Sequence, residues 1–219
     1  MAINGVFEEN LKLHIQAGYP IIYIETVEEQ RVISDIISVA NTLEPSRDIF
    51  IWDYIKGYHS KNFAIKDPFA ALEFIENSDI FQPGIFILKD YHKVINVGGI
   101  IRYLRNLIPL LKSHKKTIII TACNINIPSE IEDDTVLIDY EYPGYEKIKA
   151  FILSEAKKNN IEVHNIDQLN RLSLILKKAQ LKYDSYNKIL LNLYLMKRNK
   201  LLKQQECWNI LKLLKVLVT

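Results

Sequence analysis

The sequence predicts an α/β fold: a five-stranded, mostly parallel sheet with helices on both faces, followed by a C-terminal helical segment. Residues 84–90 and 117–124 are near-continuous apolar runs, which is typical of strands buried on both faces. The stretch between them, residues 97–114, carries apolar side chains at helical spacing. A strand, a helix and a second buried strand form a βαβ unit, and repetition of such units predicts a doubly wound parallel sheet.

Five short apolar runs are predicted to be the strands. They are residues 21–25, 49–53, 84–90, 117–124 and 135–139. Helices are predicted between and around them. These are residues 6–17, about 26–43, 67–77, 97–114 and 143–159. Residues 56–66, which are rich in Tyr, His, Ser and Asn, and residues 125–134 are predicted to be loops.

Particular residues mark three of the predicted helix ends. Gly18 ends the first helix, because glycine readily adopts the left-handed conformation found after a helix C-terminus. Thr26 followed by Glu29 has the spacing of a capping box at the start of the second helix. Asp67 before Pro68 is typical of an N-cap followed by proline at the first helical position.

Length and charge suggest one main domain with a different kind of segment after it. A chain of 219 residues accommodates a domain of about 150 residues with an appendage, or two small domains. With 48% hydrophobic and 25% charged residues, the composition is that of a globular protein. Residues 1–175 hold 18 basic and 24 acidic side chains, whereas residues 176–219 hold 10 and 2. The last segment is therefore distinctly basic.

Cysteine usage and the absence of targeting signals indicate a reducing compartment. Cys123 and Cys207 are far apart and have no metal-ligand spacing, so neither a disulfide framework nor a metal site is predicted. The first ten residues have neither the basic and apolar regions of a secretory signal nor the arginines of a transit peptide. No uncharged apolar run approaches the roughly 18 residues that a membrane span needs.

Polar residues follow two of the predicted strands. Asp90 ends the strand before the central helix, and Asn124 ends the strand after it. Both are predicted to lie at the carboxyl edge of the sheet, where open α/β sheets bind ligands. Each has two interpretations: Asp90 either holds a cation or caps the next loop, and Asn124 either contacts a ligand or hydrogen-bonds its own backbone in a turn.

Other polar groups give weaker indications of a site. Three carboxylates follow the first strand, where they either favour the positive end of the helix dipole or bind a metal: Glu25, Glu28 and Glu29. Three histidines lack the mutual spacing of a ligand set: His59, His92 and His114. Gly98 and Gly99 do not follow a strand directly, so we interpret them as a flexible lead-in to the helix instead of a phosphate-binding loop.

The runs YPIIYIET at residues 19–26 and IFILKDYH at residues 85–92 resemble the hypothetical chloroplast reading frame 46 family. Its members are AAA-domain, ATPase-like proteins of algal plastids and cyanobacteria. The resemblance covers roughly residues 6–178 and concerns the N-terminal half of the family. It implies that Asn124 holds the position of the AAA sensor-one asparagine. It also implies that this chain is truncated before the family's ATP-binding module.

The sequence departs from AAA ATPases where their chemistry resides. A P-loop has the pattern G-x-x-x-x-G-K-[ST], whereas residues 25–29 are ETVEE, with three carboxylates and no glycine. A Walker-B strand ends in Asp-Glu, whereas Asp90 stands between Lys89 and Tyr91. No arginine occurs between Asn124 and Arg171 to act as a finger. We therefore predict no catalytic residue, no metal and no cofactor, with Asp90 and Asn124 as vestigial candidates for cofactor binding.

Three segments are predicted: a degenerate AAA-like α/β domain at 1–142, a helical lid-like segment at 143–182, and a basic, leucine-rich helical tail at 183–219. The tail leaves many leucines without a partner, which predicts self-association. It also carries a basic cluster that offers a nucleic-acid or membrane-surface contact as an alternative. This cluster is Lys197, Arg198, Lys200 and Lys203.

These observations predict a non-catalytic AAA-like module for assembly or for binding a protein partner. The sequence leaves enzymatic activity open, but the missing motifs weigh against it. The alternative from another class is a receiver-like phosphoacceptor domain in which Asp90 would be phosphorylated. The composition is that of an AT-rich genome such as an organelle's, and with the resemblance it predicts the plastid stroma, or otherwise the cytoplasm of a cyanobacterium-like cell.

Overall fold

A computed structural model describes residues 6–59, 64–79, 81–141 and 144–158. The chain divides into two compact units, Met1–Tyr140 and Glu141–Thr219. The first unit contains the sheet, and the described part of the second contains helix α5, Tyr145–Lys158. The predicted boundary at 182/183, the basic cluster of the tail and most of the predicted lid-like segment lie outside the described residues.

The first unit is built on a five-stranded sheet whose neighbouring strands are all parallel, which confirms the predicted fold class. Its strands are β1 (Ile21–Glu25), β2 (Asp48–Trp52), β5 (Gly84–Lys89), β6 (Thr117–Ala122) and β7 (Thr135–Asp139). They lie in the order β2-β5-β6-β1-β7. Receiver domains have the order 2-1-3-4-5. The receiver-like alternative is therefore wrong, because β1 lies between β6 and β7 instead of beside β2.

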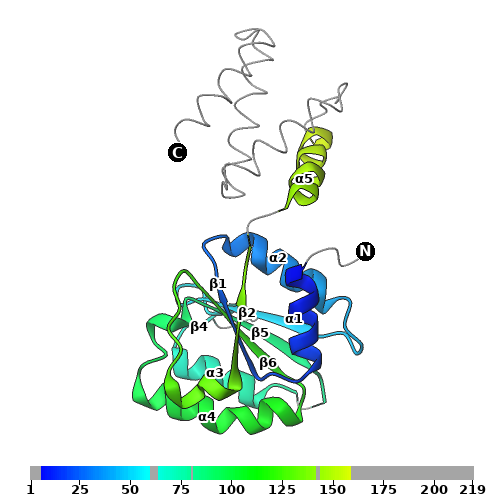
Figure 1. Ribbon diagram of the computed structural model, residues 1–219. Helices are drawn as coiled ribbons and strands as arrows, with labels where there is room; N and C mark the ends of the chain where they lie inside the picture. Colours follow the sequence, from blue (N-terminus) through cyan, green and yellow to red (C-terminus); the bar gives the residue numbers. More distant parts are fainter. Residues whose placement is uncertain (1–5, 60–63, 80, 142–143, 159–219) are drawn as a thin grey trace. The chain divides into compact units, whose positions relative to one another are not determined.

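Two helices cover each face of the sheet (Figure 1). Helices α1 (Val6–Gln16) and α2 (Glu29–Ala40) pack on one face, and α3 (Pro68–Asn77) and α4 (Gly98–Ser113) pack on the other. Successive side chains of a strand point to opposite faces of the sheet. Ile22 of β1 therefore packs with α1 and α2, whereas its neighbour Tyr23 packs with α3 and α4. Burial on both faces explains the near-continuous apolar runs.

Two of the predicted helix ends are confirmed in atomic detail. Gly18 follows α1 with a φ of +80°, the left-handed conformation that glycine adopts without strain. Asp67 precedes α3, and its carboxylate accepts a hydrogen bond of 2.9 Å from the backbone N–H of Ala70. Pro68 is the first residue of α3, where its missing N–H loses no helical hydrogen bond.

The predicted capping box at the second helix is wrong. Helix α2 begins at Glu29, its N-cap residue is Glu28, and no side chain caps it. The hydroxyl of Thr26 instead accepts a hydrogen bond of 2.9 Å from the N–H of Glu28, two residues on. A threonine can satisfy a nearby N–H in a turn as well as in a helix cap, so the Thr–Glu spacing could not distinguish the two.

Two loop predictions also require correction. The predicted loop 56–66 contains a two-stranded antiparallel sheet of β3 (Tyr58–His59) and β4 (Ala64–Ile65). The predicted loop 125–134 contains a 3-10 helix at Ser129–Asp134, with Pro128 as its N-cap residue. Gly98 and Gly99 are the first two residues of α4 and not a flexible lead-in. Close packing accounts for Gly99, because a Cβ there would lie 2.8 Å from the ring of Phe69.

Candidate functional site at the carboxyl edge of the sheet

The strands β5, β6 and β1 are neighbours, so the residues after them gather at one edge. The Tyr23 hydroxyl donates a hydrogen bond of 2.7 Å to the backbone oxygen of Asn124 and accepts one of 3.2 Å from the N–H of Asn126. Burial of Tyr23 raises the pKa of its phenol, with smaller contributions from the charges of Glu25 and Asp90. The structure thus brings the loop that contains Asn124 over the end of β1 and holds it by its backbone.

Asn126, which sequence reasoning missed, joins this loop to the one after β5. Its side-chain N–H donates a hydrogen bond of 3.0 Å to the backbone oxygen of His92. The carboxamide of Asn124 is exposed and accepts a contact of 3.4 Å from the Cys123 thiol. No sequence signal separates Asn126 from Asn124, because both are polar residues in the same loop.

Asp90 lies at the same edge in a left-handed conformation, with a φ of +53°. Its backbone N–H donates a hydrogen bond of 2.9 Å to the oxygen of Thr121, so the end of β5 stays attached to β6. Asp90 is the N-cap residue of the 3-10 helix Tyr91–Lys93, but its side chain makes no capping hydrogen bond. Its carboxylate is exposed and lies 3.9 Å from the Nδ1 atom of His92.

An ion pair that the sequence analysis did not predict links β5 to the start of α2. The Lys89 ammonium lies 2.7 Å from the Glu29 carboxylate and 3.8 Å from that of Asp53. The other oxygen of Asp53 accepts hydrogen bonds from the N–H groups of Ile55 and Lys56. The sequence shows Lys89 only as a polar end to an apolar strand, because its partners are distant in the chain.

Glu28 has a partner as well. Two guanidinium nitrogens of Arg31 donate hydrogen bonds of 2.6 and 2.9 Å to one oxygen of the Glu28 carboxylate. The same guanidinium lies 4.0 Å from the ring centre of Tyr140, whose hydroxyl donates a hydrogen bond of 2.8 Å to Asp35. Burial and then the nearby Asp35 raise the pKa of Tyr140. These contacts join the first turn of α2 to the end of β7.

The carboxylates and histidines do not converge on a metal site. Among the described residues, no group of three or more His, Cys, Asp or Glu side chains could hold a metal ion. The histidines occur on three different elements: His59 in β3, His92 in the 3-10 helix after β5, and His114 just after α4. Glu25 is exposed at the end of β1, level with Asp139 on the neighbouring strand β7.

His92 is buried, and within the described part of the chain its two ring nitrogens have no hydrogen-bond partner. Burial lowers its pKa, the charge of Lys93 lowers it further, and Asp90 opposes both. The unfolded chain therefore binds more protons than the folded one below about pH 6.5, the ordinary pKa of histidine. The stability that a neutral His92 confers is present above that pH and is lost as the pH falls.

We expect the free energy of unfolding to fall more between pH 7.5 and pH 5 in the unmodified chain than in a His92→Gln variant. Glutamine cannot be protonated in this range, so it removes only the contribution of the imidazole. Urea denaturation at several pH values measures the difference. His14→Gln, a change at a half-buried histidine of α1, is the matched control for the replacement of an imidazole elsewhere in the fold. Parallel profiles for the unmodified chain and His92→Gln would contradict the prediction.

Apolar side chains are exposed in the loops at this edge. They follow β1, β2 and β6, and their exposed fractions are 53% for Val27, 61% for Tyr54, 73% for Ile55 and 49% for Ile125. Grouped apolar residues at a surface are typical of sites that bind other proteins. In the described part of the chain, no helix has the length and apolar character needed to cross a membrane.

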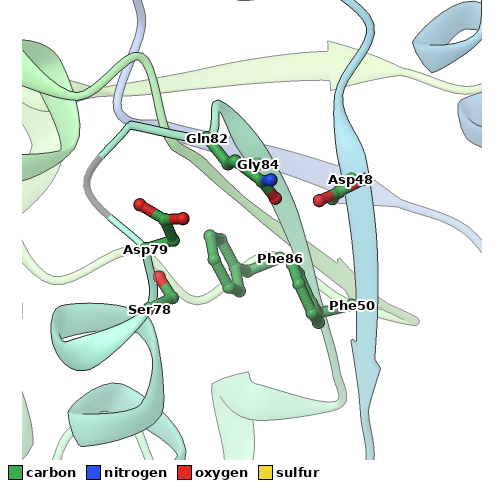
Figure 2. A pocket seen from close by; sticks show the side chains of 7 residues that line it. All are labelled: Asp48, Phe50, Ser78, Asp79, Gln82, Gly84 and Phe86. Atoms are coloured by element: carbon green, nitrogen blue, oxygen red, sulfur yellow. The ribbon is translucent and has the colours of Figure 1, made fainter.

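A small hollow lies at the opposite, amino end of the strands (Figure 2). It has about 220 Å³ of empty space, part of which is open solvent, and its lining residues come from β2, β5 and the segment after α3. They are Asp48, Phe50, Ser78, Asp79, Gln82, Gly84 and Phe86. Neither Asp90 nor Asn124 lines this hollow, so the sequence-predicted site residues and the cavity are separate features.

Comparison with protein families and curated proteins agrees with the predicted resemblance. Residues 7–140 match the family described as SpoVK-like AAA ATPase, N-terminal domain. The uncharacterized AAA domain-containing protein ycf46 of Guillardia theta is 35% identical over 173 residues, which cover 76% of this chain and 34% of that protein. The ycf46 protein of Trieres chinensis is 37% identical over 63% of this chain and 28% of its own length. The chain spans about a third of the length of these curated relatives.

Solved structures share the fold at low sequence identity. The structure of C. elegans PCH-2 has a TM-score of 0.63 at 9% identity, with 97% of this chain and 68% of that chain covered. Domain III of the Thermotoga maritima replication initiation protein DnaA has a TM-score of 0.56 at 13% identity, with 96% and 93% covered. These likenesses support the AAA-type arrangement of the sheet and carry no information on activity.

Proposed function

The chain belongs to the family of SpoVK-like AAA ATPase N-terminal domains, and from this premise we propose that it is a non-catalytic AAA-like module that acts in assembly or in binding a protein partner. In this proposal the chain has no catalytic residue and binds neither ATP nor a metal at the carboxyl edge. ATP, in the longer relatives, would bind outside the part that this chain matches.

The observation that carries the proposal is the ion pair between Lys89 and Glu29. A P-loop ATPase has a lysine and a hydroxyl residue at the start of the helix after β1, and an acid at the end of the Walker-B strand. Here the first residue of that helix is the acid Glu29, and the last residue of β5 is the base Lys89, with 2.7 Å between their charged atoms. The acid and the base therefore stand in the opposite positions from those in a P-loop ATPase.

A reversed pair has two consequences for a nucleotide. The Lys89 ammonium is already neutralised by Glu29 and by Asp53, so it offers little positive charge to a phosphate. Glu25 and Asp90 are exposed at the same edge and would repel a triphosphate. The loop after β1 also lacks the glycines that would let successive N–H groups surround a phosphate. These features support the proposal that the edge is stabilised by its own ion pairs and not by a bound nucleotide.

Exposed apolar residues favour the second half of the proposal. Val27 follows β1 and Ile125 follows β6, at the edge where an AAA ATPase would bind its nucleotide, and Ile55 follows β2 at the same edge. Each of the three is about half exposed or more. Such side chains are stabilised by a protein partner that covers them. The curated relatives come from plastid-bearing algae, which is consistent with a plastid protein, and we place the module in the plastid stroma.

We expect ATP and ADP to bind no more tightly than about 1 mM, because the edge has no N–H cradle and carries uncompensated carboxylates. Isothermal titration calorimetry with Mg-ATP measures this directly, and a phosphate-release assay checks for hydrolysis. A micromolar affinity that is lost in an Asn124→Ala variant would contradict the proposal. Ser113→Ala, at the exposed end of α4, is the control for a nonspecific effect of substitution.

A further inference from the structure

Strand β2 is one end of the five-stranded order, with β5 as its neighbour in the described sheet. The N–H of Asp48 donates a hydrogen bond of 3.2 Å to the backbone oxygen of Pro83, the residue before β5. The backbone N–H and C=O groups of successive residues in a strand point alternately to its two neighbouring positions in the sheet. Like those of Asp48, the backbone groups of Phe50 and Trp52 therefore point toward β5. The N–H and C=O groups of Ile49 and Ile51 therefore point away from the sheet.

This edge has the features of a pairing surface. Residues 48–52 read DIFIW, so apart from Asp48 at its start the strand has neither the charged side chains nor the proline that proteins commonly use to prevent edge pairing. The middle of β2 is only partly buried, at Ile49, Phe50 and Ile51. The middle residues of the central strands β5 and β6 are fully buried. An added strand would bury these side chains and satisfy the outward backbone groups.

We infer that two copies of the chain pair through β2, antiparallel, about a two-fold axis at Phe50. In this register Ile49 of one copy lies opposite Ile51 of the other, and the outward groups of both residues form four hydrogen bonds. The two Phe50 residues face each other as a non-hydrogen-bonded pair. The five-stranded sheets of the two copies then join into one continuous sheet. The inference deepens the proposed assembly role and rests on it.

Charge complementarity selects a second copy as the occupant. The register places Arg47 of each copy opposite Asp53 of the other, so two oppositely charged pairs form across the axis. Two guanidinium nitrogens of Arg47, Nε and Nη1, are buried and have no partner among the described residues. Burial lowers the pKa of this side chain, since the charge is poorly solvated. Arg47 as a whole is only partly buried, so a carboxylate from a second copy would approach the part of this side chain that lies at the surface.

The face that carries Phe50 has an aromatic stack that the partner's ring would continue. Phe50 stacks on Phe86 with 5.0 Å between ring centres, and both line the hollow at the amino end of the strands (Figure 2). Asp48 of β2 lines the same hollow. A second Phe50 at the two-fold axis would extend this aromatic stack, which adds to the burial of apolar area.

Disulfide cross-linking of the full chain tests the register. In a background with Cys123→Ser and Cys207→Ser, a Phe50→Cys variant should form a disulfide-linked dimer on mild oxidation, because facing Cα atoms of such a pair are about 4.5 Å apart. Ile49→Cys and Ile51→Cys should each give about tenfold less dimer, because identical residues are then roughly 7–8 Å apart. Non-reducing electrophoresis measures the dimer.

Two further variants separate edge pairing from association through another surface. Ile49→Pro added to Phe50→Cys should abolish the cross-link and leave the β2–β5 hydrogen bonds intact, because the N–H of Ile49 points outward. Arg47→Ala should reduce the dimer several-fold, whereas Arg105→Ala, at an exposed arginine of α4, should not. A cross-link that survives Ile49→Pro, or equal cross-linking at 49, 50 and 51, overturns the inference. ATP binding in the calorimetric test would instead refute the non-catalytic role.

Discussion

Truncation of Ile119 to alanine should lower the free energy of unfolding by roughly 2–5 kcal/mol, the range for removing a fully buried aliphatic side chain. Ile119 lies in β6, between its partners Ile87 of β5 and Ile22 of β1, and all three are completely buried. Helices α1 and α2 cover them on the same face. The central strands hold the neighbouring chain segments in place, so the surroundings cannot readily collapse into the cavity. Ile87→Ala should cost a similar amount.

Chemical denaturation of both variants measures the effect, and Ile55→Ala is the matched control. Ile55 has the same side chain but is 73% exposed in the loop after β2, so its truncation should cost less than about 0.5 kcal/mol. Values below about half a kcal/mol for both Ile119→Ala and Ile87→Ala would show that these strands are not at the centre of the sheet. An unchanged dependence on denaturant concentration confirms that folding remains two-state.

Lys116→Met should lower the free energy of unfolding by about 1.5–3 kcal/mol, the range for hydrogen bonds that involve a charged group. Lys116 precedes β6 and is 2% exposed. Its ammonium donates hydrogen bonds to the backbone oxygens of Ile75 and Ser78 and to the Ser78 hydroxyl, at 3.2, 3.0 and 2.7 Å. It thereby satisfies the Ser78 carbonyl just after α3 and is a second donor to the Ile75 carbonyl, which also accepts a hydrogen bond from the Ser78 hydroxyl. Burial lowers the pKa of Lys116.

Methionine preserves the length and apolar stem of the lysine, so the variant tests the ammonium and not the packing. Lys66→Met, at an exposed lysine before α3, should change stability by no more than about 0.5 kcal/mol. An increase in stability for Lys116→Met would mean that the penalty of burying the charge exceeds the value of its three hydrogen bonds. That result would reverse our interpretation of this contact.

The order of elements could be predicted because each signal is local. The run from Ile85 to Leu88 is apolar at every position, and Pro68 after Asp67 starts a helix wherever it occurs. The short strands β3 and β4 could not be predicted, since two residues per strand carry no measurable periodicity. Their place depends on a distant contact, in which the Trp52 indole donates a hydrogen bond of 2.8 Å to the oxygen of Ile65.

The candidate site could be located but not described from the sequence. Asp90 and Asn124 were expected at the carboxyl edge, because parallel strands end on the same side of a sheet. The ion pair of Lys89 with Glu29 joins residues 60 positions apart, and nothing near either residue indicates the other. Tyr23, an apolar strand residue by pattern, turned out to hold the loop of Asn124 by its hydroxyl.

The sequence by itself determined which segments form the five strands of the main sheet and the helices around it, and that the loop after β1 has carboxylates where a P-loop has glycines. Those features follow from side-chain periodicity and from residue identity, which are local properties. Only the tertiary structure decided that β1 lies between β6 and β7, that Lys89 neutralises Glu29, and that β2 is left at the edge. Strand order and charge pairing depend on contacts between distant residues, and these form only when the whole sheet is assembled.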